Sequence, residues 1–121
     1  MNKFDALLTF SKLRAANILR CEKDWKHSLA GWSVAEWGNA AAGDLGEACN
    51  VAKKMLRWDH NIRTELAAKS REEYKKDLAQ EIADTLIYLD LWTASEGISL
   101  EEAVRTAFNN KSDEIGSEVK I

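Results

Sequence analysis

Proline is absent from the sequence, and glycine occurs only six times in 121 residues. These two residue types supply many of the tight turns of β architectures, because glycine adopts positive φ angles and proline fixes φ for a turn. Their scarcity argues against a turn-rich β fold, and a charged fraction of 31% favours helices with one solvated face. The sequence therefore predicts an all-α protein, and its length predicts a single domain over residues 1–121.

Other features that are scarce exclude classes of site and partner. Cys21 and Cys49 lack CxxC or Cys/His spacing, which argues against a zinc site and predicts two reduced thiols. No segment approaches the ~18 apolar residues of a membrane span, so we expect a soluble, cytoplasmic protein with no membrane partner. The formal net charge of -3 argues against nucleic acid as the main partner, because a phosphate backbone requires a basic face.

Hydrophobic periodicity predicts four helices, at residues 3–20, 33–58, 70–96 and 99–114. Each of the last three begins with a Ser-x-x-Glu capping box, namely Ser33 with Glu36, Ser70 with Glu73, and Ser99 with Glu102. Gly97 and Gly116 follow the last two helices as expected of C-terminal caps. We expect the remaining segments to be irregular or extended, at residues 21–32, 59–69 and 117–121.

Two pairs of acidic residues lie on the two central helices, Asp44 with Glu47 and Glu81 with Asp84. The members of each pair are three positions apart, so their carboxylates project from one side with roots roughly 5–6 Å apart. Both pairs flank an apolar stripe and are expected to face a neighbouring helix. Carboxylates placed there without a partner repel each other and resist desolvation. A divalent cation between the helices would remove this conflict, and the alternative is a solvated acidic face.

Three glycines, Gly38, Gly43 and Gly46, interrupt the predicted helix at residues 33–58. Each costs on the order of 1 kcal/mol relative to alanine in a helix interior. With the three alanines at 40–42 they create a smooth surface, which another helix or a ligand could approach closely.

The same helical face carries Glu36 and Lys54, each close to a whole number of turns from Glu47. Carboxylates that hold Mg²⁺ beside an ammonium group are what a metal-bound polyphosphate requires. An intrahelical salt-bridge face is the alternative explanation for Lys54.

The stretch Gly43-Asp44-Leu45-Gly46-Glu47, followed by Glu81-Ile82-Ala83-Asp84, resembles the EExxE and ExxD motifs of the MazG-like all-α nucleoside triphosphate pyrophosphohydrolases. The resemblance covers about residues 20–121 and is closest to small single-domain members. It implies a four-helix bundle that assembles as a homodimer or a dimer of dimers. It also implies Mg²⁺-dependent hydrolysis of a nucleoside triphosphate, ribo or deoxy, to the monophosphate and pyrophosphate, with Mn²⁺ as a possible substitute. In that reaction a metal-activated water attacks the α-phosphorus.

The resemblance also implies roles for individual residues. The expected metal ligands are Asp44, Glu47, Glu81 and Asp84, and the expected substrate-binding residues are Lys54, Lys111, Asn109 and Asn110. Five tryptophans are candidates for stacking on the base, and we select Trp37 among them, with a position in the core as the alternative. The first glutamate of the motif is Gly43 here and the second is Asp44, which leaves the general base open. Either Glu47 or Glu36 serves, or the metal alone activates the water.

Two rival readings remain from the sequence. A di-iron carboxylate bundle requires ExxH pairs, and neither His27 nor His60 follows a glutamate at that spacing. A non-catalytic helical oligomerisation or interaction module would carry the acidic rows as solvated faces. Apolar residues over much of the first and last helices predict a homo-oligomer under either reading.

Overall fold

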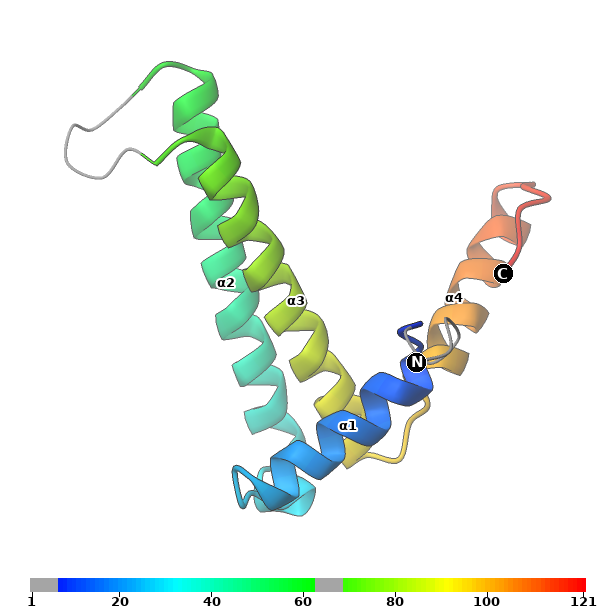
Figure 1. Cartoon of the computed structure of the whole chain (residues 1–121). Helices are drawn as coiled ribbons and strands as arrows, with labels where there is room; N and C mark the ends of the chain where they lie inside the picture. Colours follow the sequence, from blue (N-terminus) through cyan, green and yellow to red (C-terminus); the bar gives the residue numbers. More distant parts are fainter. Residues whose placement is uncertain (1–6, 63–68) are drawn as a thin grey trace. The chain divides into compact units, whose positions relative to one another are not determined.

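The computed structural model describes residues 7–62 and 69–121, and in this part of the chain all regular secondary structure is helical, without a strand. Four α-helices follow one another, α1 (Phe10–Lys23), α2 (Val34–Asp59), α3 (Arg71–Ser95) and α4 (Leu100–Glu114), with the 3₁₀ turn η1 (Leu29–Gly31) before α2 (Figure 1). The predicted all-α class is confirmed, and the last three predicted helices agree with α2, α3 and α4 to within one residue at each end.

The first helix differs from its prediction at both ends. The Thr9 hydroxyl accepts a hydrogen bond from the Lys12 N–H at 3.1 Å, and this N-cap makes α1 begin at Phe10. Leu7 and Leu8 precede the cap and are exposed, while residues 3–6 of the predicted helix lie outside the described residues. The helix also continues to Lys23, past the predicted end at residue 20.

Side-chain and glycine caps fix both ends of α3 and α4 as the sequence predicts, and the capping box predicted at Ser33 stays a prediction. The hydroxyls of Ser70 and Ser99 each accept from the N–H three residues on, both at 3.2 Å. Gly97 has a φ of 68°, and the Ile98 N–H donates to the Thr93 carbonyl at 2.9 Å, which is the longer bond of a Schellman motif. Gly116, with a φ of 72°, closes α4 in the same way.

The described chain divides into two compact units, which are described separately. One consists of the chain up to Val34 together with Asp90–Ile121, and the other is Ala35–Leu89. The single domain predicted from chain length stays a prediction.

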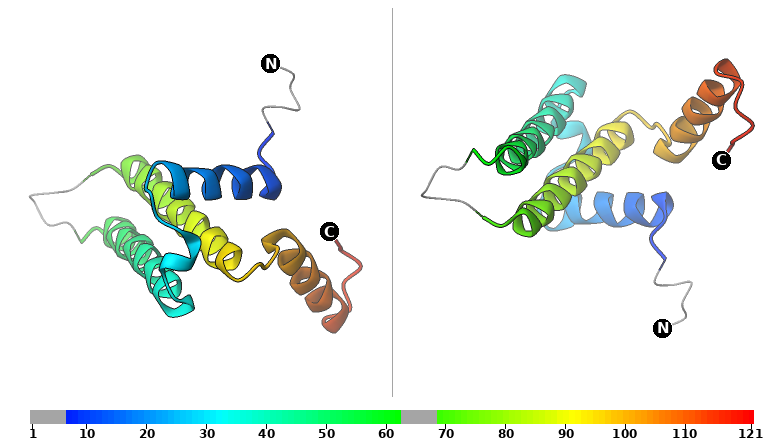
Figure 2. Two further views of the ribbon diagram at one scale, coloured as in Figure 1. Left: turned by 90° about the horizontal axis from the view of Figure 1, so that it is seen from below. Right: turned by 90° about the horizontal axis from the view of Figure 1, so that it is seen from above.

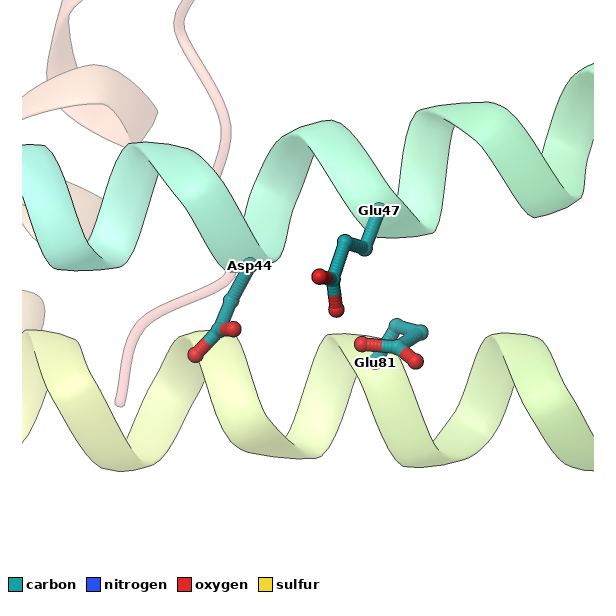
Figure 3. Close-up of side chains that lie close together, drawn as sticks. All are labelled: Asp44, Glu47 and Glu81. Carbon is teal, nitrogen blue, oxygen red and sulfur yellow. The ribbon is translucent and has the colours of Figure 1, made fainter.

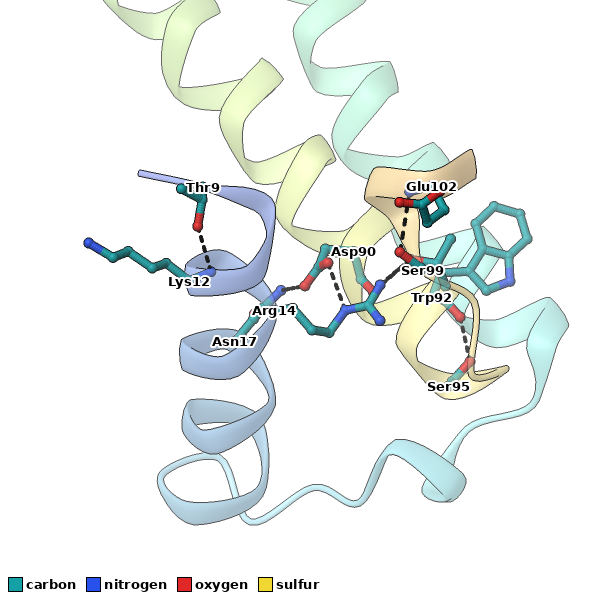
Figure 4. A network of polar contacts seen from close by, with 10 residues as sticks. Thr9, Lys12, Arg14, Asn17, Asp90, Trp92, Ser95, Ser99 and Glu102 are labelled. Carbon is teal, nitrogen blue, oxygen red and sulfur yellow. Dashed lines mark hydrogen bonds and ion pairs between the residues drawn. The ribbon is translucent and has the colours of Figure 1, made fainter. Parts of the chain in front are cut away.

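A buried ion pair organises the first unit. Asp90 is 1% exposed, and its carboxylate accepts from Arg14 Nε at 2.9 Å and from Asn17 Nδ2 at 3.0 Å (Figure 4). Arg14 donates a further hydrogen bond to Thr93 Oγ1 at 2.9 Å. Because a buried charge without a partner is strongly destabilising, these bonds hold α1 on the last turns of α3.

The second unit is an antiparallel pair of long helices, α2 and the part of α3 up to Leu89 (Figures 1 and 2). The buried stripe of α2 is formed by Trp37, Ala41, Ala48 and Val51. Asp44 falls between Ala41 and Ala48 on the same stripe, at the 3–4 spacing that keeps residues on one helical face. An acidic residue therefore interrupts the apolar contact between the two helices.

Two general features of the described residues bear on the sequence predictions. None of the helices combines the length and the apolar character that crossing a bilayer would require. Both cysteines are free thiols, Cys21 buried and Cys49 exposed, and burial raises the pKa of Cys21.

Candidate metal centre

Three carboxylates converge between α2 and α3 in the second unit. One oxygen from each of Asp44, Glu47 and Glu81 lies within 4.8 Å of the others. Figure 3 shows Asp44 and Glu47 directed from α2 toward α3, with Glu81 directed back from α3. In the described part of the chain this is the one such group of three potential metal ligands, and we call it the acidic triad.

Helix geometry explains why the triad forms. Asp44 and Glu47 are three residues apart, so they occupy neighbouring points on one side of α2. The antiparallel packing of α3 then brings Glu81 opposite this side. The sequence predicts all three as ligands, and the structure places them together.

Asp44 is the most constrained of the three. It is partly buried, and its Oδ2 atom is fully covered yet makes no hydrogen bond within the described residues. Burial raises the pKa of Asp44 above its usual value, and the negative charges of Asp84 and Glu47 raise it further. A covered acceptor without a donor is costly, so this oxygen fits an additional group.

Hydrogen bonding to Glu47 is the largest cause that raises the pKa of Glu81 above its usual value. Desolvation and the negative charges of Glu47, Asp84 and Asp44 raise the pKa of Glu81 further. Glu81 is therefore held close to other carboxylates, and a cation bound among them would relieve their repulsion.

Asp84 is the one predicted ligand that lies outside the triad. Both of its carboxylate oxygens accept from Gln80 Nε2, one turn earlier on α3, at 3.1 and 3.2 Å. Its charge reaches the triad, because it contributes to the raised pKa values of Asp44 and Glu81. Each of these oxygens keeps a further lone pair, so ligation by Asp84 stays a prediction.

A groove of about 410 Å³ opens beside the triad. Its lining includes Glu47 and Glu81 of the triad together with Asn50, Lys54, Lys69 and Asp77. Lys54 therefore lies near the triad, as its predicted role in binding substrate requires. Lys69 and Asp77 were not predicted, because neither belongs to a motif. The sequence indicates their place only indirectly, because Lys69 precedes the capping residue Ser70 and Asp77 lies one helical turn before Glu81.

Glu36, the other candidate for the general base, lies away from the triad along α2. Glu36 and Glu47 belong to one uninterrupted helix, Val34–Asp59, and eleven residues separate them. At 1.5 Å per residue this places them about 16 Å apart along the axis. The structure therefore does not bring Glu36 to the triad of its own chain, and its role as a general base stays a prediction.

Trp37 lies in the core of the second unit, which is the alternative that the sequence left open, and its role in binding substrate stays a prediction. Trp37 is 1% exposed and its ring packs against Tyr88, with a centroid distance of 6.4 Å and a tilt of 47°. The indole is part of the core and has no free face for a nucleobase. The periodicity of α2, which puts Trp37 on the same stripe as Ala41 and Ala48, already indicates this.

The predicted substrate-binding residues of α4 belong to the first unit. The Asn109 amide forms two hydrogen bonds with the backbone of Ile121, both at 2.9 Å, and so holds the final residues against α4. Lys111 donates to Glu114 at 3.0 Å, and Asn110 is exposed. These contacts are local to α4 and the tail, so the roles of the three residues in binding substrate stay predictions.

Neither histidine belongs to the acidic triad. The His27 ring stacks edge to face with Trp32 at 4.7 Å, in the first unit, and His60 is exposed beyond the end of α2.

Comparison of the chain with protein-family models, with curated proteins and with solved structures gives no match.

Proposed function

We propose that the protein is a Mg²⁺-dependent nucleoside triphosphate pyrophosphohydrolase of the MazG-like type, and that the acidic triad is its metal centre. The observation that carries the proposal is the unpaired, covered Oδ2 of Asp44 within a group of three carboxylates. The resemblance of the two motifs to those of this family supplies the substrate class. The products would be a nucleoside monophosphate and pyrophosphate.

The donor set fits magnesium. All three groups are hard carboxylate oxygens, which Mg²⁺ prefers, and the centre contains no histidine or thiolate that would favour zinc or a softer metal. Mg²⁺ usually keeps several waters and binds through few carboxylates, so three protein oxygens at one side of an open groove suit it. Mn²⁺ takes the same oxygen ligands and would substitute.

Bound at the triad, a divalent ion would neutralise phosphate charge and acidify a water molecule. The chain itself contributes the remaining steps. Glu47, exposed at the groove and paired with Glu81, is positioned to accept a proton from the attacking water. Lys54 lies two turns further along α2, where its ammonium group can meet phosphate oxygens of the leaving pyrophosphate.

We also propose that the active form is a homodimer or a dimer of dimers. Beyond the buried stripe, α2 carries a second apolar stripe that includes Leu45 and Leu56, 53% and 57% exposed. On α3, Ile82 and Leu86 are likewise exposed. Both stripes follow heptad-like spacing, and two helices alone cannot bury them, so a second copy packed on this face would complete a four-helix core.

The apolar stripes also favour the second candidate function, a non-catalytic oligomerisation module. Incubation with a panel of ribo- and deoxynucleoside triphosphates, with Mg²⁺ and with Mn²⁺, separates the two functions. We expect monophosphate and pyrophosphate from at least one nucleotide. Absence of turnover across the panel with both metals would favour the module.

Glu47→Gln tests the assignment within the active protein. We expect it to abolish turnover while the helical circular dichroism spectrum is retained, because the substitution removes a charge that the fold does not need. Glu72→Gln is the matched control, since Glu72 lies on α3 with a highly exposed side chain outside the groove. Equal loss of activity in both variants would contradict a specific role for Glu47.

A further inference from the structure

The groove beside the acidic triad is lined by residues of α2 on one side and of α3 on the other. On α2, Asn50 and Lys54 follow Glu47 by one and two turns. On α3, Asp77 precedes Glu81 by one turn. Because the two helices are antiparallel, these residues all lie on the same side of the triad, toward the start of α3 (Figure 1).

Charge is ordered along this groove. Glu47 and Glu81 of the triad line one end, and Lys54 and Lys69 lie further along with Asp77. Lys69 Nζ donates to Asp77 Oδ2 at 2.6 Å, and this hydrogen bond raises the pKa of Lys69, which keeps it cationic. Within the described residues Lys54 forms no ion pair. A groove with a cation site at one end and cationic groups at the other is complementary to a polyphosphate whose first phosphate shares the metal.

We propose that this groove binds the outer phosphates of the nucleoside triphosphate and that Lys69 is a phosphate-binding residue, released from Asp77 when the substrate enters. The inference rests on the proposed function of the triad, which determines the end at which the cleaved bond lies. It adds a residue from the segment before α3 to a site that the sequence motifs place on α2 and α3.

The exchange of partners at Lys69 is energetically accessible. The Lys69–Asp77 pair is open to solvent, with side chains 51% and 36% exposed. Such surface pairs contribute little to stability, so little is lost when one opens. A phosphate offers several charged acceptor oxygens to the ammonium group in place of one carboxylate. Asp77 thus holds Lys69 at the groove before the substrate binds and competes only weakly afterwards.

Binding of inorganic pyrophosphate in the presence of Mg²⁺, followed by calorimetry on the full chain, tests the proposal. We expect Lys69→Gln to weaken pyrophosphate binding about tenfold or more, the loss of a charge-assisted hydrogen bond. Its affinity for Mg²⁺ alone should stay unchanged. Lys75→Gln is the control, because Lys75 forms a comparable surface pair with Glu72 on α3 at 3.7 Å but does not line the groove.

Asp77→Asn supplies a test with the opposite sign. This variant removes the carboxylate that competes for Lys69, so we expect tighter pyrophosphate binding. Weaker binding in Asp77→Asn, unchanged binding in Lys69→Gln, or no pyrophosphate binding by the wild type would each overturn the proposal.

Phosphate binding in the groove and hydrolysis at the triad can be refuted independently. Pyrophosphate binding that depends on Lys69, without hydrolysis of any nucleotide, would support the groove and refute the pyrophosphohydrolase. Turnover with a Lys69-independent affinity for pyrophosphate would refute the groove alone.

Discussion

Asp44→Asn should stabilise the metal-free protein and remove its response to magnesium. In the wild type the carboxylate of Asp44 lies within 4.8 Å of its neighbours in the triad, and its Oδ2 is covered without a hydrogen bond. The amide keeps the shape of the side chain, removes the negative charge and adds an N–H donor that can reach Glu47. Both changes favour the folded state when no cation is present.

The size of the effect follows from this geometry. Because Glu47 is exposed, its repulsion with Asp44 at 4.8 Å is best taken in a water-like dielectric, where it amounts to about 1 kcal/mol. Relief of the unpaired acceptor contributes about 1 kcal/mol more. For a chain of this length, 1 kcal/mol corresponds to about 4 °C in Tm, so we expect a rise of about 8 °C in EDTA at neutral pH.

Magnesium should stabilise the wild type and have little effect on Asp44→Asn. With a Kd of about 1 mM, magnesium at about 10 mM would stabilise the wild type by about 1.4 kcal/mol, or about 6 °C, through binding to the folded state alone. Asp44→Asn should show little of this shift. Differential scanning calorimetry with EDTA and with Mg²⁺ measures both quantities. A variant less stable than the wild type in EDTA would refute the argument, because the carboxylate would then be stabilising the fold without metal.

Further outcomes follow from the same structure. Because the pKa of Asp44 is raised, the folded state holds the proton of this carboxyl more tightly than the unfolded state does. The resulting stabilisation is complete below the usual pKa of 3.8 and is lost as the pH rises through the folded pKa. Tm measured in EDTA should therefore decline between about pH 4 and 8, and less steeply in Asp44→Asn. Arg14→Ala should lower the free energy of unfolding by about 3 kcal/mol in urea titrations, since it leaves the buried charge of Asp90 without its cation, and a loss under 1 kcal/mol would show that the pair is not important for stability. Mild oxidation should cross-link a homodimer through Cys49, which is exposed on the second stripe of α2, and not through buried Cys21; an uncross-linked monomer in sedimentation at micromolar concentration would contradict the proposed assembly.

The sequence predicts the helices well, because their signals are local. Serines and glycines at the ends of α3 and α4 make hydrogen bonds to residues three to five positions away, and such bonds depend little on the rest of the chain. The start of α1 was misplaced because the apolar pattern runs through Thr9, whereas the cap at this residue decides where the helix begins.

The candidate site is only partly predictable, because it depends on which side chains meet across two helices. Spacing alone put Asp44 and Glu47 together, and antiparallel packing supplied Glu81. Spacing also gave Asp84 the same weight, although its oxygens accept hydrogen bonds from Gln80, a contact that no motif reveals. Lys69 was missed because its position at the groove depends on an ion pair with a residue eight positions away.

The two glycines beside the triad give this part of α2 an unusual local property. A Cβ added at Gly43 or Gly46 would meet nothing within 4 Å, so no neighbour in the described chain requires a glycine at either position. Their backbone freedom instead makes the two turns that present Asp44 and Glu47 easier to open than the rest of the helix. Amide hydrogens there should exchange with deuterium faster than those in the middle of α3. Ligand binding would slow that exchange first, which makes the rate at these turns a direct reporter of occupancy.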